Sequence, residues 1–152
     1  MSSARMEIAD LKALAPEIAA ALSALSQAAL NAGIEKGLAE LIKVRISQMN
    51  GCTFCLQFHI NLAREYGVTQ SKLDQLAAWR ESPIYSSRER LGLHAAEALT
   101  TIAGGEIPEE EFEEFVEEFG EKGLAGLLAT VGVINAWNRF GMTYRFTPPV
   151  AK

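Results

Sequence analysis

The segment from residue 40 to residue 59, ELIKVRISQMNGCTFCLQFH, constrains this chain more than any other stretch. Both cysteines of the protein, Cys52 and Cys55, lie in it, and His59 follows four residues after the second. The Cys-x-x-Cys spacing lets two thiols form a disulfide with little backbone rearrangement, which is typical of exchangeable redox pairs. From Cys52 the chain has no proline or glycine until Gly67, so it is predicted to be helical. On that helix the two cysteines and His59 share one face.

This arrangement predicts cysteine thiols that are more acidic than usual. A free cysteine has a pKa near ~8.5, and a helix N-terminus or an adjacent imidazolium lowers it by one to several units. Cys52 would lie in the first helical turn, where unpaired N–H groups favour an anion, and Cys55 would lie one turn from His59. Glu40 belongs to the preceding helical segment. If the chain reverses at residues 49–51, its carboxylate comes close to the thiols or to His59.

The residues of this segment resemble a motif of the alkylhydroperoxidase D (AhpD-like) branch of the carboxymuconolactone decarboxylase superfamily, namely Glu40, Ser47–Cys52, Cys55 and His59. The resemblance covers roughly residues 34–150 and includes residues 79–90, 98–100, 134–139 and Pro148-Pro149. Some family members carry a second histidine between the two cysteines, whereas this chain has Thr53-Phe54 there. A proton relay through that extra imidazole is therefore not expected.

Apolar spacing and helix-ending residues predict an all-α protein of about seven helices in a single domain. No stretch predicts a convincing strand. Within the domain we expect an N-terminal helix in residues 1–33 and an AhpD-like helical domain in residues 34–150. The individual helices are predicted at residues 7–30, 34–48, 52–67, from Thr69 or Ser71 to about 80, from Ser86 or Ser87 to about 103, 109–119 and 124–142.

Composition and charge exclude several classes of partner. The net charge of −5 and the pI near 5.1 argue against nucleic acid and anionic membrane, because both attract basic surfaces. The polar opening residues 1–7 predict no secretory leader, and the weakly polar run 123–137 is too short to span a bilayer. Two cysteines without a leader indicate the cytoplasm and a redox-active pair. No Gly-x-Gly-x-x-Gly or Walker-type loop occurs, so no cofactor is expected.

Several residues allow more than one interpretation. Glu40 lies among apolar neighbours and needs either a salt bridge to Lys43 or Arg45, which can themselves point outward, or a place in a proton relay. Cys52, Cys55 and His59 could also be an inert pair with a core histidine, or three ligands of a zinc site completed by Glu40 or His94. His94 itself, the acidic run 109–119 and residues 137–139 are interpreted as structural. The small residues Gly126, Ala129, Gly132 and Ala136 fit either internal packing or a subunit contact.

Together the residues and the resemblance favour a thiol peroxidase. Glu40, through a water, and His59 would remove the proton from Cys55, whose thiolate attacks a hydroperoxide; Cys52 would then close the disulfide. Cys52, nearer the helix start, would meet an external dithiol reductant, of thioredoxin-like or lipoyl type. The resemblance also implies a homo-oligomer, commonly a trimer or hexamer. The alternatives are a disulfide-exchange or redox-sensing protein, a carboxymuconolactone decarboxylase-like enzyme, and a non-catalytic helical scaffold.

Overall fold

The structure, a computed structural model, describes residues 3–152 and confirms the all-α prediction. Seven α-helices and two short 3-10 turns make up the regular structure of this range, which contains no strand. In chain order they are α1 (Ile8–Leu14), α2 (Pro16–Asn31), α3 (Lys36–Asn50), α4 (Thr53–Glu65), α5 (Gln70–Gln75), η1 (Leu76–Glu81), α6 (Ser87–Thr100), η2 (Ile102–Gly104) and α7 (Glu109–Tyr144).

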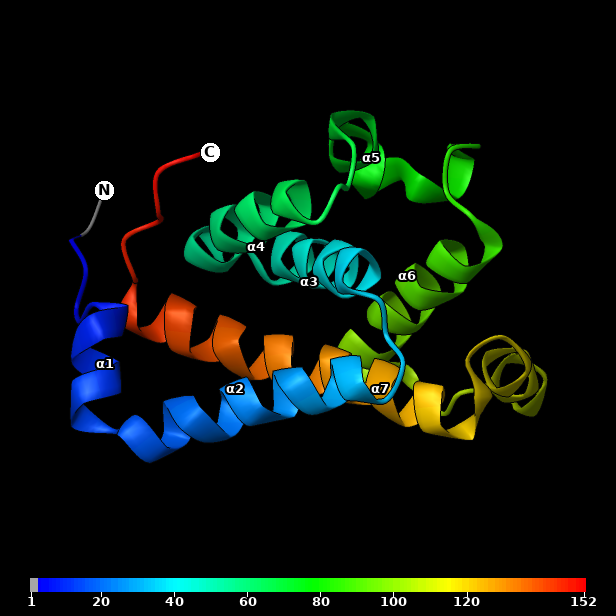
Figure 1. The fold of residues 1–152 in the computed structure, drawn as a ribbon, viewed down its shortest axis with the longest axis horizontal. Helices are drawn as coiled ribbons and strands as arrows, with labels where there is room; N and C mark the ends of the chain where they lie inside the picture. Colours follow the sequence, from blue (N-terminus) through cyan, green and yellow to red (C-terminus); the bar gives the residue numbers. More distant parts are fainter. Residues whose placement is uncertain (1–2) are drawn as a thin grey trace.

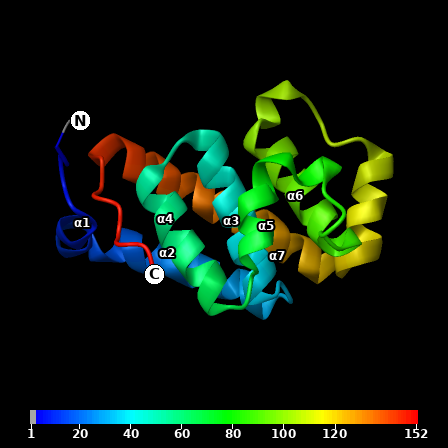
Figure 2. The same ribbon diagram turned by 90° about the horizontal axis from the view of Figure 1, so that it is seen from above.

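Helix α3 is the central element of the bundle, because it packs against α4, α6 and α7 (Figures 1 and 2). Helices α2 and α7 lie side by side along the length of the molecule (Figure 1). Apolar side chains of α3 such as Leu41, Ile42 and Ile46 are completely enclosed. With neighbours on several sides, α3 also buries the polar residues between them, including Glu40 and Ser47. The fold thus encloses polar side chains as well as apolar ones inside the bundle.

The prediction of one helix over residues 7–30 is wrong, because the chain bends by 109° between α1 and α2. Pro16 opens α2, and proline disfavours the helical conformation in the residue before it. Ala15 accordingly has φ −135° and ψ 65°. In the described part of the chain no single helix is long and apolar enough to cross a membrane; only the bent pair α1 and α2 together has that length and composition.

The division of the C-terminal region also differs from the prediction. Helices expected at 109–119 and 124–142 form one element, α7, which is sharply kinked at Gly120 (φ 69°, ψ 165°). A positive φ is readily adopted by glycine, so the kink falls at this residue. Gly123 lies inside the helix instead of bounding it, and α6 ends at Thr100, before the expected residue 103. Residues 109–119, before the kink, form the α7 arm, which is the yellow segment of Figure 1.

The start and end of the chain are hydrogen-bonded to each other beside α4. The amide N of Arg5 donates to the carbonyl of Tyr144 (2.8 Å), and the hydroxyl of Thr147 donates to Glu7 Oε1 (2.6 Å). Farther along the tail, Asn61 Nδ2 of α4 donates to the carbonyl of Val150 (2.9 Å). These bonds join the segment before α1 to the C-terminal tail, and the tail to the helix that carries the cysteines.

Candidate active site

The two cysteines lie at a tight connection between α3 and α4. Gly51 adopts a left-handed conformation (φ 74°, ψ 26°), which reverses the chain after Asn50. The amides of Gly51 and Cys52 both donate to the carbonyl of Ser47, at 2.9 and 3.1 Å. Cys52 is the N-cap of α4, and its sulfur accepts a hydrogen bond from the amide of Cys55 (3.3 Å). The helix therefore begins one residue later than predicted.

Cys52 and Cys55 form a disulfide with their Cα atoms 5.4 Å apart, and both side chains are almost fully buried, at 2% and 3% exposure. Helix α7 passes directly against the sulfurs at Gly141. A Cβ atom at Gly141 would lie 2.7 Å from the Cys52 sulfur and 3.1 Å from the Cys55 sulfur, closer than van der Waals contact allows. Glycine at this position is what gives the disulfide its space.

Gly141→Ala is expected to destabilise the oxidised protein by about 1–3 kcal/mol, because the added methyl group overpacks the contact with the sulfurs. Urea unfolding of the oxidised protein measures this effect. The matched control is Gly132→Ala on the same helix, where the added Cβ has no neighbour within 4 Å. That change is expected to stabilise by about 0.5–1 kcal/mol through helix propensity. Equal effects of the two substitutions would contradict the close approach at Gly141.

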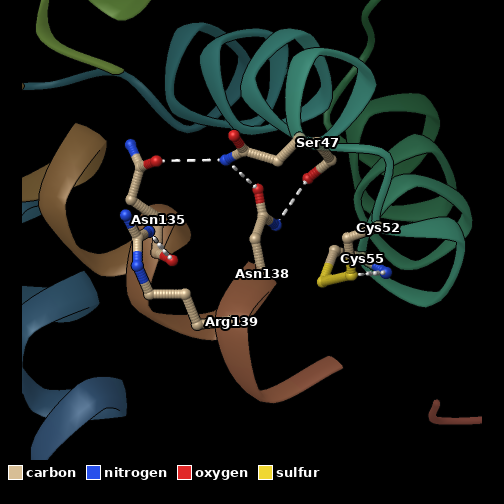
Figure 3. The surroundings of a disulfide bond; sticks show 7 residues. Ser47, Cys52, Cys55, Asn135, Asn138 and Arg139 are labelled. Carbon is tan, nitrogen blue, oxygen red and sulfur yellow. Dashed lines mark hydrogen bonds between the residues drawn. A yellow bond between two sulfur atoms is a disulfide. The ribbon is translucent and has the colours of Figure 1, made fainter. Parts of the chain in front are cut away.

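A partly buried amide network joins the end of α3 to α7 next to the disulfide (Figure 3). Asn138, 1% exposed, donates from Nδ2 to Ser47 Oγ (3.1 Å) and accepts at Oδ1 from Asn50 Nδ2 (2.8 Å). Asn50 Nδ2 also lies 3.0 Å from Asn135 Oδ1. Because Ser47 and Asn50 belong to the turn that carries Cys52, the network fixes the cysteine segment against α7. The structural interpretation of residues 137–139, as packing and helix-end polar contacts, agrees with this network, although the partners of Asn138 were not predicted.

Glu40 joins Lys43 of its own helix to His59 of α4 in a buried polar cluster. Its Oε2 atom lies 2.5 Å from His59 Nδ1, and its Oε1 atom lies 3.2 Å from Lys43 Nζ. Lys43 Nζ in turn donates to Ser26 Oγ on α2 (3.0 Å). Glu40, Lys43 and His59 are at most 8% exposed. Glu40 therefore forms the predicted salt bridge to Lys43 and also contacts His59. The contact with His59 is direct, whereas a bridging water was expected. Lys43 is buried, so the expectation that it can point outward is wrong.

Electrostatics assign protonation states to this cluster. Burial by itself raises the pKa of Glu40, but the hydrogen bond from His59 and the nearby Lys43 cation outweigh it, so the pKa lies below the ordinary 4.5. Burial lowers the pKa of His59 below 6.5, and the bond to Glu40 opposes this only in part. Near neutral pH Glu40 is thus a carboxylate and His59 is neutral. With Nδ1–H donated to Glu40, the Nε2 lone pair of His59 can accept a proton.

A cavity of about 210 Å³ opens beside the disulfide between α1, α2, α4 and α7. Cys55 and His59 line it, whereas Cys52 is not among its lining residues. The other walls come mostly from apolar and aromatic side chains, with a few polar ones: Ile8, Lys12, Ser23, Ser26, Lys43, Phe54, Phe58, Leu62, Val133, Ile134, Trp137 and Phe146. A small organic molecule can therefore reach the sulfur of Cys55 next to a neutral imidazole.

The sequence pattern of the carboxymuconolactone decarboxylase family matches residues 16–98. The uncharacterised protein YdfG of Bacillus subtilis is 33% identical over 129 residues, which cover 85% of this chain and 88% of YdfG. The chain belongs to the carboxymuconolactone decarboxylase family.

Solved structures place the protein in the AhpD-like branch of that family. A crystal structure of a protein of unknown function from Agrobacterium tumefaciens has a TM-score of 0.86 and 32% identity, covering 97% of this chain and 99% of that one. The alkylhydroperoxidase AhpD core of an uncharacterised peroxidase-related protein from Ralstonia eutropha has a TM-score of 0.79 and 26% identity, covering 92% and 75%.

Between its two cysteines this AhpD-like protein has Thr53 and the aromatic residue Phe54. Phe54 lines the cavity, and its ring packs edge-on against Phe146 of the C-terminal tail, with 5.3 Å between ring centroids. Its centroid also lies 5.9 Å from that of Phe58, one turn along α4. The position between the cysteines is thus used for an apolar wall. Only the spacing of Phe54 and Phe58 on the cysteine helix hinted at this wall in the sequence.

The zinc interpretation finds no support in the arrangement of the side chains. Within residues 3–152, no three His, Cys, Asp or Glu side chains are grouped so that they could hold a metal ion. His94 lies apart from the cysteines and pairs with Glu111 of the α7 arm, with 2.9 Å between Nε2 and Oε2. This partner was missed in the sequence, although the structural interpretation of His94 agrees with it.

Proposed function

We propose that this AhpD-like protein is a thiol peroxidase that reduces organic hydroperoxides. The observation that carries the proposal is the position of Cys55 in the wall of an apolar cavity, beside the buried pair of His59 and Glu40. A hydroperoxide needs a nucleophilic thiolate, a base that generates it, and a site that admits the organic group. All three are adjacent here, and the disulfide is the oxidised end product of such a reaction.

The proposed cycle begins with both cysteines reduced. His59 Nε2 takes the proton of the Cys55 thiol, and Glu40 stabilises the resulting imidazolium. The Cys55 thiolate attacks the terminal oxygen of the hydroperoxide; the O–O bond breaks, and the leaving alkoxide takes the proton from His59 to become an alcohol. Cys55 is then a sulfenic acid. The Cys52 thiol condenses with it, forming the S–S bond and releasing water.

An external dithiol would complete the cycle by reducing the disulfide and leaving as a disulfide itself. Both sulfurs are nearly inaccessible in the structure, and Cys55 rather than Cys52 faces the cavity. This geometry favours entry of a slender dithiol arm, of the lipoyl type, over direct docking of a thioredoxin-like protein, and it favours attack at Cys55. Such a donor requires a reducing compartment, and we propose the cytoplasm. We also propose a homo-oligomer, on the resemblance alone.

The remaining alternatives differ in what they require of the thiols. A decarboxylase or lactone-handling enzyme would use His59 on a carboxylate substrate and would need no bonded cysteine pair. A disulfide-exchange or redox-sensing protein would use the pair but would need neither the apolar cavity nor a base at its wall. The bonded cysteine pair therefore favours peroxide reduction over decarboxylation, and the cavity with a base in its wall favours it over disulfide exchange.

The reduced protein is expected to consume cumene hydroperoxide catalytically when dihydrolipoamide is supplied, releasing one cumyl alcohol per peroxide. Peroxide loss and disulfide formation are followed together, with reduced protein alkylated by iodoacetamide as the control. The alkylated protein should show only the background rate. A pair that cycles with dihydrolipoamide while the peroxide disappears no faster than in buffer would contradict the proposal and support disulfide exchange.

A further inference from the structure

The cavity beside Cys55 has chemically different ends. Cys55 and His59 form a buried end, at 3% and 8% exposure. Lys12, in the last turn of α1, and Ser23 of α2 also line the cavity but are exposed, so they border its opening to solvent. Aromatic side chains, among them Phe54 and Trp137, also belong to the cavity wall. A molecule whose reactive group reaches the sulfur would therefore have an apolar middle and a terminus close to solvent and to an ammonium group.

The charge at this cavity is opposite in sign to that of the whole protein. The chain carries a net charge of −5, yet no aspartate or glutamate is among the lining residues. Lys43 is neutralised by Glu40 at 3.2 Å. Lys12 forms no salt bridge with any side chain in residues 3–152, so its charge is available to a ligand. An exposed cation in the wall of a mostly apolar cavity attracts a ligand that ends in an anion.

The size of the cavity limits the apolar part of the ligand. A cavity of about 150 Å³ lined by apolar side chains accommodates benzene. The cavity here, at about 210 Å³, has room for a body somewhat larger than one ring, such as a phenyl group with a short alkyl branch. The charged terminus would add no volume to the interior, because Lys12 is exposed.

We propose that the substrates are compact amphiphilic hydroperoxides that carry a carboxylate, which pairs with Lys12 while the peroxide group lies at Cys55. This inference rests on the proposed peroxidase function for its chemistry. The carboxylate part of the inference rests only on the cavity and on the exposed Lys12 in its wall. Lys12 is a specificity-determining residue in this assignment and takes no part in the bond changes.

Binding of unreactive product alcohols tests the ligand class without turnover. Cumyl alcohol and para-carboxycumyl alcohol differ only in the carboxylate, and their dissociation constants are measured by calorimetry with the oxidised protein. The carboxylated alcohol is expected to bind about threefold to fivefold more tightly, the size of one partly exposed ion pair. Lys12→Gln should remove this preference and Lys12→Arg should keep it. Lys122→Gln, an exposed lysine outside the cavity, is the control for net charge and should change nothing.

Turnover separates failure of this inference from failure of the peroxidase proposal. Wild type should have a lower KM for para-carboxycumene hydroperoxide than for cumene hydroperoxide at similar kcat, and Lys12→Gln should equalise the two KM values. Rapid turnover of both peroxides with equal KM, together with equal binding of the alcohols, would overturn the carboxylate assignment and leave the peroxidase intact. A Lys12-dependent preference in binding without any peroxide consumption would uphold the ligand site and overturn the peroxidase.

Discussion

Replacing Cys55 with serine is expected to abolish reaction with peroxide, whereas Cys52→Ser should permit one turnover and then stop. The reason is the placement of the two sulfurs. Cys55 lines the cavity with His59, and Cys52 does not. Without Cys52 the first oxidation still occurs, but the sulfenic acid of Cys55 has no thiol with which to condense. The two serine variants are therefore predicted to behave differently although each removes one sulfur of the same disulfide.

Peroxide consumption by a known amount of reduced protein, without added dithiol, measures this difference. We expect about one equivalent for wild type and for Cys52→Ser, and none above background for Cys55→Ser. Dimedone, which reacts with sulfenic acids, should label Cys52→Ser at Cys55 and should leave wild type largely unlabelled. The reverse pattern, with Cys55→Ser consuming one equivalent, would show that Cys52 attacks first, as the helix N-terminus would favour.

Removing the proposed general base, His59, should have the next largest effect on the reaction with peroxide. His59→Gln is expected to slow the first reaction with peroxide by about 10²–10⁴-fold near neutral pH, the range typical of general base catalysis. Glutamine keeps a polar group at the position but cannot accept the thiol proton. His94→Gln is the matched control, because His94 also pairs with a glutamate but lies outside the cavity. Its reaction rate should equal that of wild type.

Glu40→Gln should slow the same reaction, because a neutral amide stabilises the imidazolium less well than a carboxylate. The variant also leaves Lys43 buried without its counter-charge, and removing one partner of a buried pair commonly costs about 3–5 kcal/mol. Glu40→Gln with Lys43→Met removes that unpaired charge and separates the two effects. If the double variant is folded and reacts at the wild-type rate, Glu40 has no role in catalysis.

The sequence was sufficient for the fold class and for the residues of the cysteine helix, because both depend on local spacing. The predicted helix boundaries were wrong where a helix-breaking residue was overlooked, or where a glycine was taken to end a helix that continues through it. Pro16 divides a run of alanines and leucines that looks continuous, while Gly123 stays inside α7 because the kink falls at Gly120. Thr69 and Ser86, each predicted as one of two candidate N-caps, do cap their helices, since capping depends on the few residues that follow.

The rest of the candidate site depends on contacts between segments that are distant in the sequence. Nothing near Gly141 indicates that its missing side chain makes room for sulfurs almost ninety positions earlier. Lys43 looked like a surface residue because its partner Ser26 belongs to another helix. The contact between Glu40 and His59 was expected only as one of several possibilities, since it requires α3 and α4 to pack in one particular register. Spacing along one helix could not supply that register.

The most direct test of the account is the pKa of the Cys55 thiol in reduced Cys52→Ser protein, followed by thiolate absorbance against pH. We predict a value below the ordinary ~8.5 of a free cysteine, because in the reduced protein the Cys55 thiolate and the imidazolium of His59 stabilise each other, and a clear rise when His59→Gln is added. A thiol that titrates at or above the ordinary value, and at the same value in both variants, would contradict the claim that His59 and Glu40 activate Cys55.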